Sequence, residues 1–153
     1  MSRDAPHRKT VKRYDVPHGV HGLTFSCLRR KPFLASDRTR QFLCDAVHSA
    51  RAKHGFHLWA YVIMPEHVHL VLWFPQERYS ISATLQSIKQ SVGRRATDYL
   101  RAHNPRGLDA LRTGLADRPY SFWLDGGGHD DNIDDERGLG NWIEYVHNNP
   151  VKR

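Results

Sequence analysis

Two histidines, His67 and His69, lie two positions apart within residues 64–72 (MPEHVHLVL). The proline and glutamate before them predict a turn, and the residues that follow alternate as in a β-strand. Because successive side chains of a strand point to opposite faces of the sheet, both imidazoles face one side while Val68, Leu70 and Leu72 face the core. Two neutral imidazoles on a rigid strand supply two ligands of a divalent-metal site. An ordinary pair of buried histidines is the alternative that this pattern leaves open.

The charge of the chain favours a polyanionic partner such as nucleic acid. The 153 residues contain 23 Lys and Arg against 16 Asp and Glu, giving a net charge of +7. No apolar run reaches the length of a membrane span, so no membrane partner is expected. The two cysteines, Cys27 and Cys44, lack metal-ligand spacing and are predicted to be buried free thiols, typical of a reducing cytoplasm.

The chain is predicted to form one domain over residues 19–153, preceded by a basic arm over residues 1–18. Lys12 and Arg13 in that arm are candidate contacts to DNA phosphates. An untethered terminus without a ligand is an equally good interpretation of the arm.

The order of predicted elements gives an α+β fold. Strands are expected over 21–28, 56–64 and 67–74, with a last strand starting at 121–124. The strand over 56–64 is apolar almost throughout and is expected to be covered on both faces. Helices are expected from Ser36 to Gly55, along an apolar stripe from Ile81 to Tyr99, and over about 135–149. This order predicts a ferredoxin-like split βαβ sheet with helices on one face and an added C-terminal helix.

Lys89 and Arg95 flank the apolar stripe of the second helix, and Arg94 lies on the far side of that helix. Charged side chains on such a helix usually only face solvent. Contact with phosphate groups is a less common role, for which the candidates are Lys89, Arg94 and Arg95.

The final helix places Tyr145 and Asn149 on one flank, because residues four positions apart are neighbours on a helix. Its apolar stripe borders that flank, and a tyrosine at such a border is most often a solvent-exposed residue. Two glycines, Gly138 and Gly140, lower the helix propensity by about 1 kcal/mol each. The helix is therefore expected to be held mainly by packing, with an adjustable angle to the sheet.

Two separated segments resemble one protein family. Residues 58–70 (LWAYVIMPEHVHL) resemble the signature of bacterial single-tyrosine HUH transposases, named after a histidine, a hydrophobic residue and a histidine. Residues 145–152 (YVHNNPVK) are similar to the second signature of the REP-associated tyrosine transposase branch, where REP is a repeated extragenic palindrome. Residues 122–132 (FWLDGGGHDDN) are similar to a third segment, and the likeness covers about residues 20–153 in order.

The resemblance implies a metal-dependent endonuclease and strand transferase acting on single-stranded DNA at hairpins or palindromes. It implies that His67, His69 and Asn149 bind Mg²⁺ or Mn²⁺, and that Tyr145 is the nucleophile that forms a 5′-phosphotyrosine link. Such a protein acts in the bacterial cytoplasm, at the nucleoid, as a monomer or homodimer. Glu66 departs from the family, which commonly has asparagine there, and adds a negative charge beside the expected metal.

Other functions are compatible with parts of the pattern. A protein that grips DNA hairpins without cutting them, such as a repressor, would keep the same fold. A structural zinc site is disfavoured because no cysteine accompanies the histidines. A replication initiator or relaxase would share the chemistry, but the second signature fits the transposase branch better.

Overall fold

The computed structural model describes residues 15–125 and 128–148 of the chain and confirms the α+β class. The predicted order of strand, helix, two strands, helix, strand and helix is present. The elements are β1 (Val20–Ser26), α1 (Asp37–His54), β2 (His57–Ile63), β3 (His67–Trp73), α2 (Ile81–His103), β4 (His129–Ile133) and α3 (Glu136–Asn148), with short 3₁₀ helices η1 (Leu28–Arg30) and η2 (Pro105–Leu111).

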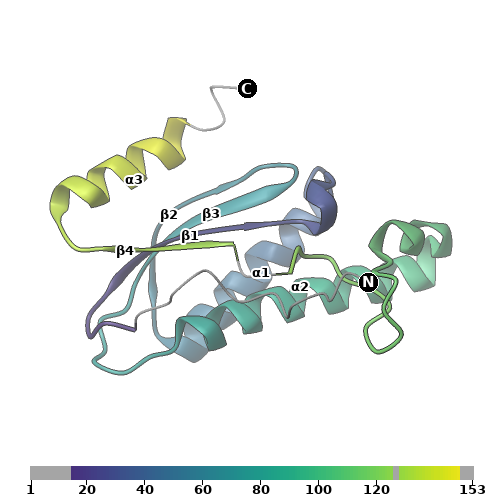
Figure 1. The fold of residues 1–153 in the computed structure, drawn as a ribbon, viewed down its shortest axis with the longest axis horizontal. Coiled ribbons are helices and arrows are strands. Elements are labelled where there is room, and N and C mark those ends of the chain that lie inside the picture. Colours follow the sequence, from purple (N-terminus) through teal and green to yellow (C-terminus); the bar gives the residue numbers. More distant parts are fainter. Residues whose placement is uncertain (1–14, 126–127, 149–153) are drawn as a thin grey trace, which may run out of the picture.

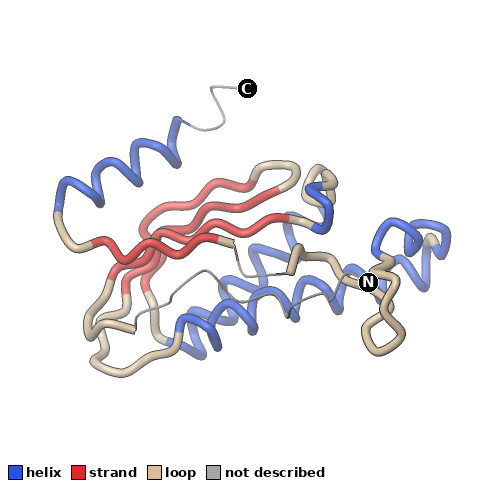
Figure 2. Tube along the Cα trace, in the orientation of Figure 1, coloured by secondary structure: helices blue, strands red, loops and turns tan. Residues whose placement is uncertain are grey.

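The four strands form one antiparallel sheet in the order β2-β3-β1-β4. The helices α1 and α2 cover one face of this sheet, and α3 lies over the opposite face (Figure 1). The tube in Figure 2 shows the same three layers, with the strands between two groups of helices. β3, which carries the two histidines, is therefore an inner strand held by a neighbour on each side.

The first helix begins and ends where its capping residues predict. The Ser36 side chain accepts a hydrogen bond from the Thr39 amide at 3.3 Å, and Gly55 closes the helix with a φ of 74°. α2 begins in the same way, because the Ser80 hydroxyl accepts a hydrogen bond from the Ala83 amide.

Each face of the sheet has its own hydrophobic core. The larger core lies between the sheet and α1 and α2, and includes the predicted stripe of α2. The smaller core lies under α3, and its buried members are Ala60, Val62, Met64, Val71 and Val146. The histidine face of β3 thus belongs to the thinly covered side of the sheet.

Two expectations about burial are wrong. β2 is an edge strand with a bulge between Leu58 and Ala60. It is not covered on both faces, because Trp59 and Tyr61 are 42% and 55% exposed. Cys27 is buried as predicted, but Cys44 is exposed on α1.

The last strand begins at His129 instead of Ser121. Phe122 and Trp123 turn into the larger core, and only an isolated bridge joins Trp123 to Cys27. Burial of two large aromatic side chains outweighs the β-strand propensity of this segment.

The predicted basic arm lies almost entirely outside the described residues, and so do Lys12 and Arg13. In the described parts of the chain, every helix is too short or too polar to cross a bilayer.

Candidate active site

His67 and His69 lie side by side on β3, as their spacing predicts. Their ring centroids are 4.7 Å apart in an edge-to-face arrangement, and both side chains are buried. The register of the sheet places His67 opposite Ser26 and His69 opposite Thr24 on β1. The backbone of an inner strand thus fixes the separation of the two imidazoles.

A hydrogen bond at Nδ1 orients each imidazole. The Thr24 hydroxyl lies 2.8 Å from Nδ1 of His69, and the Glu66 carboxylate lies 3.1 Å from Nδ1 of His67. The Glu66 carboxylate can only accept at Nδ1 and so favours the His67 tautomer in which Nε2 binds a metal, and the Thr24 hydroxyl can accept from Nδ1 of His69 in the same way. The Glu66 carboxylate therefore lies on the Nδ1 side of the His67 imidazole, away from Nε2. A carboxylate in this position raises the basicity of a histidine ligand.

Burial keeps the second histidine in its ligand form. Loss of hydration, with a smaller contribution from neighbouring His67, lowers the pKa of His69 to about 4. The ring is consequently neutral at pH 7, which is the form that coordinates a cation.

The tertiary fold brings Tyr145 to this histidine pair. Tyr145 lies on α3, and its ring centroid is 5.1 Å from that of His69 in an edge-to-face contact. The side chain is 50% exposed, so one side of the phenol faces the histidines and the other faces solvent. A half-exposed tyrosine whose ring contacts one of two neighbouring imidazoles is an arrangement suited to nucleophilic attack on an incoming substrate.

Two imidazoles with oriented Nε2 atoms fit a divalent metal, but they are only part of a ligand set. Among the residues that the structure describes, no third His, Cys, Asp or Glu joins them in a group that could hold a metal ion. The predicted amide ligand, Asn149, lies outside the described residues.

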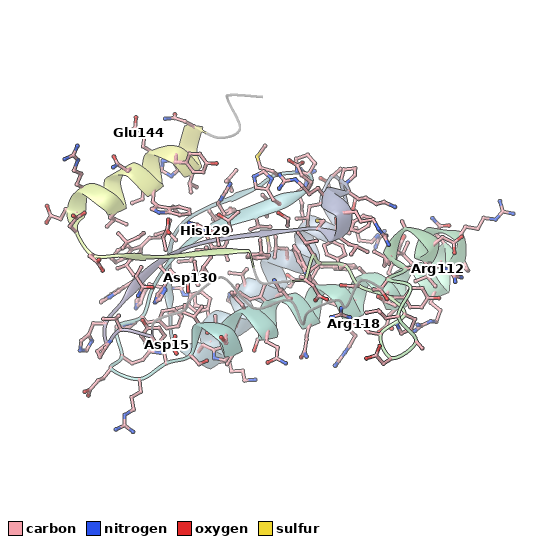
Figure 3. All side chains as sticks on the ribbon, viewed as in Figure 1. Asp15, Arg112, Arg118, His129, Asp130 and Glu144 are labelled. Carbon is pink, nitrogen blue, oxygen red and sulfur yellow. The ribbon has the colours of Figure 1, made fainter. Side chains whose placement is uncertain are left out.

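Three of the five basic residues predicted to contact DNA, Lys89, Arg94 and Arg95, are on α2, across the sheet from the histidines. Arg95 donates to the Asp45 carboxylate at 2.8 Å and lies over the Phe42 ring, so it ties α2 to α1. Lys89 and Arg94 instead line an open groove of about 920 Å³ between α2 and residues 118–125, called the α2 groove below. Figure 3 shows Arg118 on the α2 side of the sheet, away from α3.

The α2 groove reaches the end of the sheet where the histidines lie. Backbone hydrogen bonds join Leu124 to Ser26 and Phe122 to Leu28, and another joins Cys27 to Glu66. One wall of the groove is therefore attached to the end of β1 opposite His67, so a long ligand could contact both places.

A second buried polar group lies on the other face of the sheet. The Nδ1 of His21 is 2.9 Å from the Asp130 carboxylate, and its Nε2 is 2.7 Å from the Tyr79 hydroxyl, which donates to the Val16 carbonyl. Figure 3 shows Asp130 on β4. This network joins three parts of the fold and does not touch the histidine pair.

Sequence reasoning missed the roles of Thr24, Gly22 and Asp131. Thr24 is paired with His69 by the strand register, and Gly22 lies against the Trp142 side chain of α3. Asp131 accepts a hydrogen bond from the same Trp142 side chain. The strand pattern of residues 21–28 could have indicated that Gly22 and Thr24 share a face, but not which residues lie over them.

Comparison with known proteins identifies the family. A model of the family described as transposase IS200 like matches residues 19–107, which include β1, both histidines and α2. The chain belongs to the IS200-like transposase family. The resemblance seen in the two signatures is thus confirmed at family level.

One curated relative carries a description consistent with this family. A protein from Haemophilus influenzae (strain Rd), described as a REP-associated tyrosine transposase, is 25% identical over 123 residues. That match covers 76% of this chain, and the chain spans only 65% of the length of the relative.

Two solved structures share the fold. A REP-associated tyrosine transposase bound to a REP hairpin superposes with a TM-score of 0.67 at 22% identity, covering 92% of this chain and 72% of that one. A protein from Deinococcus radiodurans R1, described as a transposase, superposes with a TM-score of 0.54 at 19% identity, covering 90% and 95%.

Proposed function

We propose that this IS200-like transposase cuts and rejoins single-stranded DNA next to hairpins or palindromic repeats, with Tyr145 as the nucleophile. The observation that carries the proposal is the contact between the Tyr145 ring and His69, 5.1 Å apart between centroids. His69 lies near the middle of the chain and Tyr145 near its C-terminal end, so the two residues meet only in the folded protein. The hairpin bound to the REP-associated neighbour supports the choice of substrate.

In the proposed reaction the Tyr145 hydroxyl oxygen attacks a phosphorus atom of the DNA backbone. A tyrosine–phosphorus bond forms, the bond to the 3′ oxygen breaks, and a 5′-phosphotyrosine link and a 3′-hydroxyl result. Water takes the phenol proton, because the side chain is half exposed, and the departing oxygen gains a proton. The link conserves the phosphodiester bond, so the reverse attack by a 3′-hydroxyl rejoins DNA without ATP.

Mg²⁺ or Mn²⁺ is the proposed cofactor, held by His67 and His69 with Asn149 as the oxygen ligand. When bound, such a cation polarises the scissile phosphate and offsets developing negative charge. Thr24 and Glu66 hold the two imidazoles in the ligand orientation. Tyr145, whose ring contacts His69 from α3, contributes the nucleophilic oxygen.

The α2 groove is the proposed contact surface for the remainder of the DNA. Lys89 and Arg94 line it, and backbone bonds connect its wall to the end of the sheet that carries His67. Binding of Lys12 and Arg13 to phosphates is part of the same proposal. Action at the bacterial nucleoid in the cytoplasm follows from this choice of substrate.

The decisive experiment is the capture of a covalent protein–DNA adduct. Wild-type protein, incubated with hairpin single strands and Mn²⁺, should form an adduct that peptide mapping places on Tyr145. Tyr145→Phe removes one oxygen atom and should abolish the adduct while keeping hairpin affinity within a few-fold. Tyr61→Phe is the matched control, because Tyr61 is similarly exposed but lies on β2, and it should react like wild type.

An adduct on another residue, or undiminished cleavage by Tyr145→Phe, would overturn the assignment. Tight hairpin binding by wild-type protein without any adduct would favour the alternative of a binding protein or repressor on the same fold.

A further inference from the structure

The indole of Trp142 lies directly on the backbone of β1 at Gly22. A methyl group at Gly22 would be 2.6 Å from Cδ2 and 2.8 Å from Cζ2 of Trp142, and closer still to Cε2. Real side chains do not approach this closely, so only glycine admits the indole at this place. The ring occupies the depression between Val71 on β3 and Asp131 on β4, the two residues paired with Gly22.

The polar edge of the same indole is bonded to β4. Trp142 Nε1 donates to the Asp131 carboxylate at 3.2 Å, and the other oxygen of this carboxylate lies 2.7 Å from Nε2 of His129. Trp142 is therefore fixed in both position and rotation, by the flat contact with Gly22 and by the hydrogen bond to Asp131.

Besides Trp142, the apolar contacts of α3 with the sheet come from Val146 and from the partly buried Leu139 and Ile143. Among the residues of α3, all of which the structure describes, only Val146 is fully buried. The helix begins just after β4, where the Asp135 side chain caps it by accepting from the Gly138 amide at 2.6 Å. The cap holds the first turn, so the position of the later turns depends on how Trp142 and its apolar neighbours pack.

We propose that Gly22, Trp142 and Asp131 form a latch that positions Tyr145 over His69. Trp142 precedes Tyr145 by three residues on one side of the helix, and its ring centroid is 6.2 Å from the rings of both His69 and Tyr145. Raising the indole from Gly22 therefore moves the phenol away from the histidines. This inference rests on the proposed function, in which Tyr145 is the nucleophile. The three latch residues position that nucleophile and do not themselves react.

The first test adds one methyl group beneath the indole. At saturating hairpin, Gly22→Ala should slow formation of the covalent adduct about a hundredfold, because a displacement of about 1 Å has that effect on a positioned reaction. The dissociation constant of the hairpin should stay within a few-fold. Gly140→Ala is the matched control, because a methyl group there meets nothing within 4 Å, and it should keep the wild-type rate.

A double-mutant cycle shows whether the indole causes the effect. Trp142→Leu should itself slow the reaction, because the anchor is lost. In the Trp142→Leu background, adding Gly22→Ala should cause little further loss, because the atoms that clash are gone. An equal loss in both backgrounds, or a wild-type rate for Gly22→Ala, would overturn the latch. Asp131→Asn keeps an oxygen acceptor for the indole and should stay closer to wild type than Asp131→Ala.

Hydrogen exchange tests the latch without relying on catalysis. Gly22→Ala should accelerate exchange of the α3 amides while the amides of β3 remain protected. If wild-type protein forms no adduct, the proposed function fails, but hydrogen exchange of the α3 amides still tests whether the latch holds the helix. Unchanged exchange in α3 would refute it.

Discussion

At the scale of single residues, the hydrogen bonds behind the two imidazoles determine how well they can serve as ligands. Thr24 and Glu66 each contact an Nδ1 atom, and neither residue is a candidate metal ligand itself. Partners of this kind fix the ring orientation, and their loss commonly lowers metal affinity without changing the ligands.

Thr24→Val should therefore weaken Mn²⁺ binding by about 10-fold to 100-fold, because valine keeps the shape of threonine but has no oxygen. Calorimetric titration with Mn²⁺ measures the change. Thr97→Val serves as the control, since the Thr97 hydroxyl donates to the Gly93 carbonyl within α2, on the other face of the sheet from the histidines. Equal Mn²⁺ affinity for wild type and Thr24→Val would contradict the role assigned to the hydroxyl.

At the scale of elements, the buried network of Asp130, His21 and Tyr79 joins β4, β1 and the segment that leads into α2. The Tyr79 ring also stacks on Phe74, with centroids 4.1 Å apart. Burial, with smaller effects from Asp15 and Asp130, raises the pKa of Tyr79 to about 12 from 10.0.

This shift predicts a loss of stability in alkali. The folded protein holds the phenol proton more tightly than the unfolded chain, so the stabilisation is complete below pH 10 and disappears as the pH rises to about 12. The difference in free energy of unfolding between wild type and Tyr79→Phe should therefore shrink over that range. Urea unfolding at a series of pH values measures it.

The same comparison removes the contribution of Cys27. Burial raises the pKa of the Cys27 thiol to about 12 as well, but this thiol is present in both proteins and cancels in the difference. A difference between the two proteins that stays constant up to pH 12 would show that Tyr79 ionises as easily in the folded state as in the unfolded chain.

At the scale of the whole molecule, the proposed DNA surface extends around one end of the sheet. The histidine pair and Tyr145 lie on the α3 side, whereas the α2 groove lies on the other. A hairpin bound across both would release counterions from each phosphate that a cation contacts, so affinity should fall steeply as salt rises.

Substitutions on α2 test this arrangement. The slope of log affinity against log salt is negative, and Lys89→Ala and Arg94→Ala should each make it less steep by about one, as expected for one lost phosphate contact. Arg95→Ala should leave the slope unchanged, because Arg95 is paired with Asp45 and packed on Phe42. Fluorescence anisotropy with a labelled hairpin measures the slopes. If only the Arg95 variant changed the slope, the α2 groove would not be the contact surface.

Local sequence patterns were sufficient for much of the fold. The caps at Ser36 and Gly55, the alternation around His67 and His69, and the apolar stripe of α2 all act between residues close in the chain. Hydrogen bonding and side-chain periodicity over such short distances depend little on the remainder of the protein. The element order and the α+β class could therefore be derived before the structure was known.

Errors arose where long-range contacts outweigh local preference. The segment containing Phe122 and Trp123 enters the core because a space beside Phe25 and Phe33 is available to its rings. The exposure of Trp59 follows from the position of β2 at the sheet edge, which depends on strand order. Neither fact is encoded in the alternation of apolar and polar residues.

The sequence by itself determined which side chains share a strand or a helix, and so which histidines form a pair and which helix flank carries Tyr145. Only the tertiary structure decided that Tyr145 meets His69, that Thr24 and Glu66 orient the imidazoles, and that Gly22 receives Trp142. The reason is physical: periodicity fixes directions within an element, whereas the distance between elements depends on the packing of side chains far apart in the chain.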